Sequence, residues 1–212
     1  MSTVLLTGFE PFAGDQTNPS GDAVVRLGAV WNGPARLVTA VLPVDFARAG
    51  AELIELVATH RPDVVIATGL AGGRDAITPE RIAVNLRDAR IPDNAGHQPV
   101  DTASIPGAPL AYASSLPVKA IATEIAASGI PASVSLSAGS FVCNDVFFTV
   151  AHVSANTPGL RAGFIHVPWD AENAPPGAAS LPQADITRAL EIAVITTLTY
   201  TSDLDVPAGH LA

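Results

Sequence analysis

Residues 64–69 read Val64-Val65-Ile66-Ala67-Thr68-Gly69, an apolar run that follows the turn signal Pro62-Asp63 and breaks at a glycine. An uninterrupted apolar run of this length is typical of a strand that is buried on both faces by helices. The composition agrees, because aromatic residues make up only 5% of the chain and the core must consist mainly of Val, Ile, Leu and Ala. Residues 64–69 therefore predict a central strand of an α/β fold.

Further strand and helix patterns alternate along most of the chain. Strands are predicted at residues 4–8, 37–42, 82–86, 132–136 and 162–168. Helices are predicted from a cap at Asn18, over about 46–59, over 115–128 with a start near Pro117, after Cys143, and from 181 or 185 to 198. This alternation predicts an α/β fold, a three-layer α/β/α sandwich with a largely parallel (mixed), twisted central sheet. No repeat or linker interrupts it, so residues 1–212 are expected to form a single domain, with a loose tail over about 200–212.

Composition and charge exclude several classes of protein. The 212 residues carry 11 Lys and Arg against 20 Asp and Glu, and the resulting net charge of -9 leaves no basic patch for nucleic acid. The single cysteine cannot form an internal disulfide, so a cytoplasmic location is expected. No apolar run reaches the roughly 18 residues of a membrane-spanning helix, and the N-terminus has no cationic start of a signal peptide. A soluble, acidic globular protein is therefore predicted.

The one cysteine, Cys143, lies between the predicted strand 132–136 and a predicted helix. The first N–H groups and the positive dipole end of that helix would lower the pKa of its thiol. His166 closes the apolar run 162–168. A lone Cys with a His elsewhere in the chain is a candidate nucleophile and base, although a single Cys is more often a small buried hydrophobic residue.

Such a pair also needs an acid that orients the base, and residues 70–109 hold the candidates. This stretch contains little predicted helix, and loops of this length are usually functional. Its acids are Asp75, Glu80, Asp88, Asp93 and Asp101. Glu80 opens the strand-like run that follows it, which gives it a modest advantage over Asp93. A surface salt bridge with Arg74 or Arg81 is the alternative role for Glu80.

The sequence lacks the motifs of a nucleotide-binding site, a metal site and a serine nucleophile. The Gly-rich segments 8–14 and 69–74 do not have the spacing of a nucleotide-binding loop. The five histidines are scattered without metal-ligand spacing, so no metal is expected. Ser140 lacks the second glycine of a serine-nucleophile turn. Three phenylalanines in loop segments either plug the core or line an apolar pocket, namely Phe9, Phe12 and Phe141.

Four segments together resemble the type I pyroglutamyl peptidases (pyrrolidone-carboxylate peptidases), a family of cysteine exopeptidases. The first is Leu6-Thr7-Gly8-Phe9-Glu10-Pro11-Phe12 with Asn18-Pro19-Ser20. The second is Glu80-Arg81-Ile82-Ala83-Val84-Asn85 with Asp88-Ala89-Arg90-Ile91-Pro92-Asp93-Asn94. The others are Ser137-Ala138-Gly139 with Val142-Cys143-Asn144, and Gly163-Phe164-Ile165-His166-Val167-Pro168. They occur in the order of the family and span residues from about 4 to 169.

The resemblance implies a single catalytic domain that removes N-terminal pyroglutamate from peptides. It implies a triad of Cys143, His166 and Glu80, which selects Glu80 among the acids, and a thioester intermediate. It also implies that Phe9, Phe12 and Phe141 form the pocket for the lactam ring and that backbone groups near Asn18 and Leu70 hold it. Arg90 matches a family arginine near the thiol, with a role in positioning the ligand or supporting the thiolate. No metal or cofactor is expected. The resemblance also implies a homo-oligomer, namely a tetramer.

Two other functions remain open from the residues alone. A non-enzymatic binding protein could keep the phenylalanine pocket, and a nucleoside phosphorylase or hydrolase could share the α/β architecture. The chain also departs from the family pattern at Ala13, where a glycine is common, and at 169–173, where Trp169 begins an unfamiliar continuation. These departures are expected to affect loop shape and subunit contacts more than the triad.

Overall fold

A computed structural model describes residues 1–209, and a central five-stranded sheet forms its middle layer. The strands are β1 (Thr3–Phe9), β2 (Arg36–Leu42), β3 (Val64–Leu70), β4 (Thr78–Pro79) and β7 (Arg161–Val167), in the order β2-β1-β3-β7-β4. β1, β2, β3 and β7 pair in parallel, and β4 pairs antiparallel to β7. β3 is buried along its whole length. The predicted mixed sheet and its central strand are confirmed.

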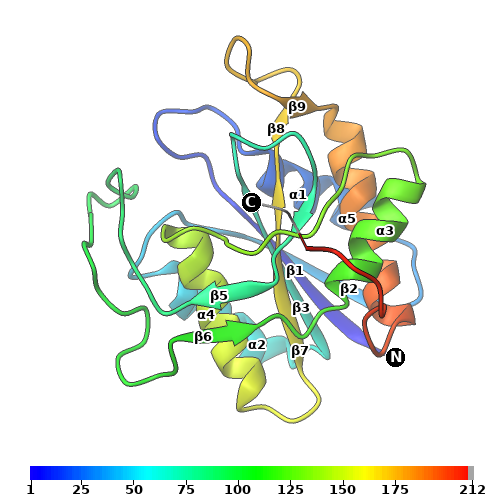
Figure 1. Cartoon of the computed structure of the whole chain (residues 1–212), viewed down its shortest axis with the longest axis horizontal. Coiled ribbons are helices and arrows are strands. Elements are labelled where there is room, and N and C mark those ends of the chain that lie inside the picture. The colour runs from blue at the N-terminus through cyan, green and yellow to red at the C-terminus, as the bar shows by residue number, and fades with distance from the viewer. Residues whose placement is uncertain (210–212) are drawn as a thin grey trace.

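Helices cover both faces of this sheet (Figure 1). One face carries α1 (Pro19–Val30), α3 (Val118–Ala127) and α5 (Gln183–Thr199), and the other carries α2 (Ala49–His60) and α4 (Val142–Ala155). Successive strand residues divide between the two cores, because side chains alternate across a strand. Val64 and Ile66 face the first group of helices, and Val65 faces the second. The three-layer sandwich is confirmed, and no helix of residues 1–209 is long and apolar enough to cross a membrane.

Residues 70–115 carry a short hairpin that lies on the outer side of α4 (Figure 1). Its strands are β5 (Ile82–Val84) and β6 (Ala111–Ala113), paired antiparallel. The buried side chain of Asn144 accepts a hydrogen bond from Val84 N and donates to the carbonyls of Val84 and Leu86. The Asn144 amide thus makes the hydrogen bonds that the backbone of a neighbouring strand would otherwise make, and it fixes the hairpin to α4. A second small pair, β8 (Trp169–Asp170) and β9 (Ser180–Leu181), follows β7.

The predicted strand at 132–136 is wrong, because this segment forms only isolated bridges beside residues 77–80. Ile77 N donates to Pro131 O, Ser133 N donates to Ile77 O, and Ser135 N donates to Pro79 O. The next donor of a parallel ladder would be the nitrogen of Pro79, which carries no hydrogen. The bonding resumes where Arg81 N donates to Ser135 O, so Pro79 leaves a gap in the ladder, and the segment runs extended beside residues 77–81 without forming a continuous strand.

The described part of the tail packs against α3. Asp203 accepts hydrogen bonds from the backbone nitrogens of Lys119 and Ala120, and Lys119 Nζ donates to Val206 O. Residues 200–209 contain no helix or strand, but Asp203 supplies the cap that Pro117 cannot give to α3. The tail is thus attached at these points, and the part of the predicted loose tail at 210–212 lies outside the described residues.

We expect Asp203→Ala to lower the free energy of unfolding by about 1 kcal/mol, the usual value of a helix cap. For a chain of this size the change corresponds to a fall in Tm of about 2–4 °C. Thermal unfolding followed by circular dichroism measures it. Asp205→Ala, at an exposed position two residues further on, is the matched control. Equal Tm values for the two variants would show that the tail contributes no cap.

Candidate active site

Three segments meet at the carboxyl ends of β3 and β7. Gly69 of β3 and His166 of β7 are paired partners in the parallel register. Cys143 is the second residue of α4, and a methyl group on Gly69 would lie 2.7 Å from its Sγ. The predicted convergence of Gly69, Cys143 and His166 is confirmed. Gly8, the fourth predicted member, instead faces the start of α1, because a methyl group there would meet the backbone of Ser20 and Gly21.

The close contact between Gly69 and the thiol makes Gly69→Ala a sensitive substitution. The added methyl would also lie 2.9 Å from the ring of Phe164, so either the thiol or this buried ring must move. We expect a loss of about 1–3 kcal/mol in the free energy of unfolding and slower alkylation of Cys143 by iodoacetamide. Gly73→Ala is the matched control, because open space surrounds a methyl group there. Wild-type behaviour of Gly69→Ala in both measurements would contradict this packing.

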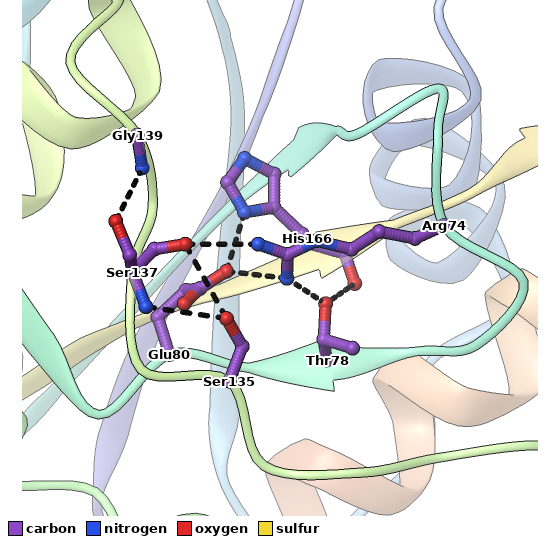
Figure 2. A network of polar contacts seen from close by, with 7 residues as sticks. All are labelled: Arg74, Thr78, Glu80, Ser135, Ser137, Gly139 and His166. Atoms are coloured by element: carbon purple, nitrogen blue, oxygen red, sulfur yellow. Dashed lines mark hydrogen bonds and ion pairs between the residues drawn. The ribbon is translucent and has the colours of Figure 1, made fainter. Parts of the chain in front are cut away.

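His166 and Glu80 form a buried pair (Figure 2). The distance between His166 Nδ1 and Glu80 Oε1 is 2.7 Å, and the two residues are 4% and 0% exposed. Glu80 follows β4 directly, and its backbone nitrogen donates to Phe164 O, which fixes it beside β7. An ionised carboxylate only accepts, so Nδ1 carries the proton and Nε2 is left free as a base. In Figure 2 the second ring nitrogen points away from the carboxylate.

Arg74 binds the same carboxylate oxygen. Its Nη1 lies 2.6 Å from Glu80 Oε1, and its Nη2 donates to Ser137 O at 2.9 Å (Figure 2). The alternative salt bridge of Glu80 with Arg74 therefore exists, but it is added to the bond with His166 and its acid is buried. Burial would raise the pKa of Glu80, yet the hydrogen bond from His166 and the neighbouring positive groups hold this pKa below its ordinary value.

The predicted low pKa of the Cys143 thiol is wrong. Burial, followed by the negative charge of Glu80, raises the pKa of Cys143 to about 12, although Arg74 acts in the opposite direction. Burial also lowers the pKa of His166, while Glu80 raises it and Arg74 lowers it. Surrounding protein thus outweighs the helix dipole at this thiol. Both pKa shifts favour a neutral thiol and a neutral imidazole over a thiolate and an imidazolium.

A pocket of about 350 Å³ opens at these residues. Its lining includes Cys143, His166 and all of the predicted ring-pocket residues, which are Phe9, Phe12, Asn18, Leu70 and Phe141. The rings of Phe12 and Phe141 are tilted with centroids 6.2 Å apart. The pocket is lined further by residues that the sequence did not indicate, namely Val44, Ala71, Arg74, Ser137, Ala138, Gly139 and Val142. The phenylalanines therefore line a cavity, and Phe9, 2% exposed, belongs to the core as well.

Two other predicted candidates lie away from this pocket. Arg90 is exposed and is not among the lining residues, so its role in positioning a ligand stays a prediction. Asp93, the second candidate acid, accepts hydrogen bonds from the backbone nitrogens of Phe46, Ala95 and His97. Its carboxylate holds a loop together, whereas Glu80 alone of the candidate acids contacts His166 among residues 1–209.

Ala13 and Trp169, the departures from the family pattern, have visible structural consequences. Ala13 has a φ of 56°, in the left-handed region that glycine adopts without strain and that costs other residues about 1–2 kcal/mol. Trp169 packs against Gly72, where a methyl group would lie 2.5 Å from its Nε1. The indole of Trp169 therefore packs against the loop that carries Arg74.

The fold and the site define an α/β protein whose pocket joins a thiol, an imidazole and a buried carboxylate, the groups of a cysteine hydrolase. A family model described as pyroglutamyl peptidase matches residues 2–200. The pyrrolidone-carboxylate peptidase of Bacillus amyloliquefaciens is 46% identical over 210 residues, which cover 98% of each chain. That of Clavibacter michiganensis is 45% identical over 212 residues, the full length of both.

Solved structures agree with the sequence matches. The crystal structure of pyroglutamyl peptidase I from Bacillus amyloliquefaciens superposes with a TM-score of 0.94 at 45% identity, covering 98% of this chain and 100% of that one. The pyrrolidone carboxyl peptidase of Thermococcus litoralis gives a TM-score of 0.92 at 41% identity, with the same coverage. The chain belongs to the pyroglutamyl peptidase family, and it is a hydrolase. These matches give no support to the non-enzymatic and nucleoside-processing alternatives.

Proposed function

We propose that this protein is a cysteine exopeptidase that removes an N-terminal pyroglutamyl residue from peptides through Cys143, His166 and Glu80. The observation that carries the proposal is the apolar pocket in which Cys143 and His166 lie together, with the imidazole held by a buried carboxylate. The names of its relatives supply the substrate class.

The reaction begins with a neutral thiol. Sγ of Cys143 attacks the pyroglutamyl carbonyl carbon while its proton passes to Nε2 of His166. The C–N bond then breaks, the leaving amine takes the proton from His166, and a thioester remains on Cys143. Water, deprotonated by His166, hydrolyses the thioester, and the proton returns to Sγ. Glu80 keeps Nδ1 protonated and stabilises the imidazolium of each transfer.

Donors for the developing oxyanion are available at the start of α4. The first N–H groups of any α-helix have no intrahelical partner, and no side chain caps those of α4 at Phe141. Val142 and Cys143 both line the pocket, which supports a role for their backbone N–H groups as oxyanion donors. Backbone N–H groups held in this way stabilise a tetrahedral oxyanion by several kcal/mol.

Selectivity follows from the apolar lining of the pocket. Pyroglutamate is an uncharged lactam ring that fits between aromatic side chains and needs only a few polar partners. An ordinary N-terminal glutamate would bring an ammonium and a carboxylate into the same space without counter-charges, at a cost of several kcal/mol. Backbone groups near Asn18 and Leu70, both in the lining, are the proposed partners of the lactam.

Hydrolysis of a pyroglutamyl-aminocoumarin substrate by the reduced wild-type protein tests the function, with the prolyl analogue as control. We expect release of the fluorophore from the pyroglutamyl compound alone. Absence of hydrolysis by folded, reduced protein would overturn the proposal, and equal rates on both compounds would overturn the role of the lactam. A cytoplasmic location and a tetrameric assembly stay predictions, and sedimentation velocity measures the second.

A further inference from the structure

The guanidinium of Arg74 joins three segments that meet around the acid. It contacts Thr78 Oγ1 on β4, Glu80 Oε1 beyond β4, and Ser137 O on the segment that leads to Cys143 (Figure 2). Backbone hydrogen bonds hold that segment to residues 77–81 as far as Ser135, and the bond from Arg74 adds a side-chain contact two residues further on. Arg74 therefore connects the segment that leads to Cys143 with β4 and with Glu80, which follows β4 directly.

Arg74 and His166 both form hydrogen bonds with the same carboxylate oxygen of Glu80. Both bonds end on Oε1, at 2.6 Å from Arg74 and 2.7 Å from His166. Glu80 is fully buried, whereas the side chain of Arg74 is 26% exposed. A planar guanidinium whose other nitrogen is fixed on Ser137 O restricts rotation of the carboxylate, which a flexible ammonium could not do as well. The orientation of the imidazole thus depends on Arg74 through Glu80.

The loop that carries Arg74 is itself held in place. Ala71 N donates to Val167 O at the end of β7, and Arg74 N donates to Ala71 O. Gly72 lies against the indole of Trp169 with no room for a side chain. Arg74 is therefore presented from a fixed turn beside the pocket, whose lining it shares with Cys143 and His166.

We propose that Arg74 is a positioning residue of this active site, which orients Glu80 on His166 and holds the 135–139 segment that precedes Cys143. The inference rests on the proposed function and deepens it. The charged and titratable groups that bear on the imidazole are Glu80 and Arg74, and the same two bear on the thiol. Arg74 lowers both of their pKa values, so its removal acts on the pH profile as well as on the geometry.

The test compares Arg74→Met and Arg74→Lys with wild type on the pyroglutamyl-aminocoumarin substrate, from pH 4.5 to 10. We expect Arg74→Met to lower kcat about 100-fold, the effect of misplacing a catalytic group by about 1 Å. Its acidic limb in kcat/KM moves to higher pH, because the lost positive charge had favoured neutral imidazole. Arg74→Lys keeps a charge but not the fork, so kcat falls while the acidic limb stays in place. Arg81→Met, at an exposed arginine beside Glu80, is the matched control.

A double-mutant cycle with Glu80→Gln separates positioning from a general loss of structure. If Arg74 acts through Glu80, Arg74→Met lowers kcat far less in the Glu80→Gln background than in wild type. An active wild type with unchanged kcat and unchanged pH limbs in Arg74→Met overturns this inference alone, and an inactive wild type overturns the proposed function first. Should Arg74→Met not fold, wild-type kcat in folded Arg74→Lys overturns the inference.

Discussion

Cys143→Ser is expected to lower kcat on a pyroglutamyl substrate by about 10⁴- to 10⁶-fold, the range seen when a covalent nucleophile is removed. A hydroxyl is nearly isosteric with the thiol, so the packing against Gly69 and the pocket shape should persist. It is a far weaker acid and nucleophile, and the neutral imidazole of His166 cannot deprotonate it as readily. Hydrolysis of the aminocoumarin substrate, with active-site titration of the wild type, measures the fall.

Ser140→Ala is the matched control for this substitution. Ser140 lies three residues before the thiol, and its hydroxyl donates to Asp88 O rather than to any group of the pair. We expect activity of this variant within a few-fold of wild type. Retention of more than about 1% of the wild-type kcat by a serine variant that unfolds at the wild-type Tm would exclude Cys143 as the nucleophile.

Glu80→Gln is expected to lower kcat by about 10⁴-fold, as the loss of the orienting acid does in other triads of this kind. An amide oxygen in the place of Oε1 could still accept from Arg74 and from His166 Nδ1, because both bonds end on that one atom. The substitution removes the negative charge, so the imidazolium that forms in each proton transfer loses its stabilisation. The rate on the aminocoumarin substrate measures the loss, and Asp75→Asn, an exposed acid of the same loop, is the control.

The same substitution should change the dependence of stability on pH. Because the pKa of Glu80 in the folded protein lies below its ordinary value of 4.5, its ionised form stabilises the fold above about that pH. This contribution is lost as the pH falls through the lower, folded-state value. The difference in Tm between wild type and Glu80→Gln should therefore be full at neutral pH and shrink below pH 4.5. A difference that stays constant down to pH 3 would show that Glu80 is not held ionised.

The layered fold and the position of the pocket could be predicted because their signals are local. The β3 run is apolar throughout, so it requires cover on both faces, and its end at Gly69 marks the edge where ligands bind in such sheets. Asn18 before Pro19 marks the start of α1, and its side chain accepts from Ser20 N as a cap does. Helix starts were less evenly predicted, since α2 begins at Ala49, three residues later than expected, while α3 begins at Val118, beside the expected start near Pro117.

The choice of the acid that contacts His166 could not be predicted from residue patterns. Glu80 and Asp93 are similar in sequence, both in a polar stretch with arginine or histidine nearby. The structure separates them through backbone contacts, because Asp93 accepts from two N–H groups of its own loop and from Phe46 N, while Glu80 lies beside β7. Only the family resemblance could choose between them beforehand.

The sequence by itself determined the four parallel strands, the helices and the presence of one thiol and one imidazole at a helix start and a strand end. These features depend on neighbours within a few residues. Tertiary structure alone decided three further features. Arg74 reaches Ser137 across 63 positions of the chain. Pro79, by lacking an N–H, leaves a gap in the backbone ladder between residues 77–81 and 131–135. The pKa of Cys143 is raised by burial and by the charge of Glu80, and both causes come from segments distant in the sequence.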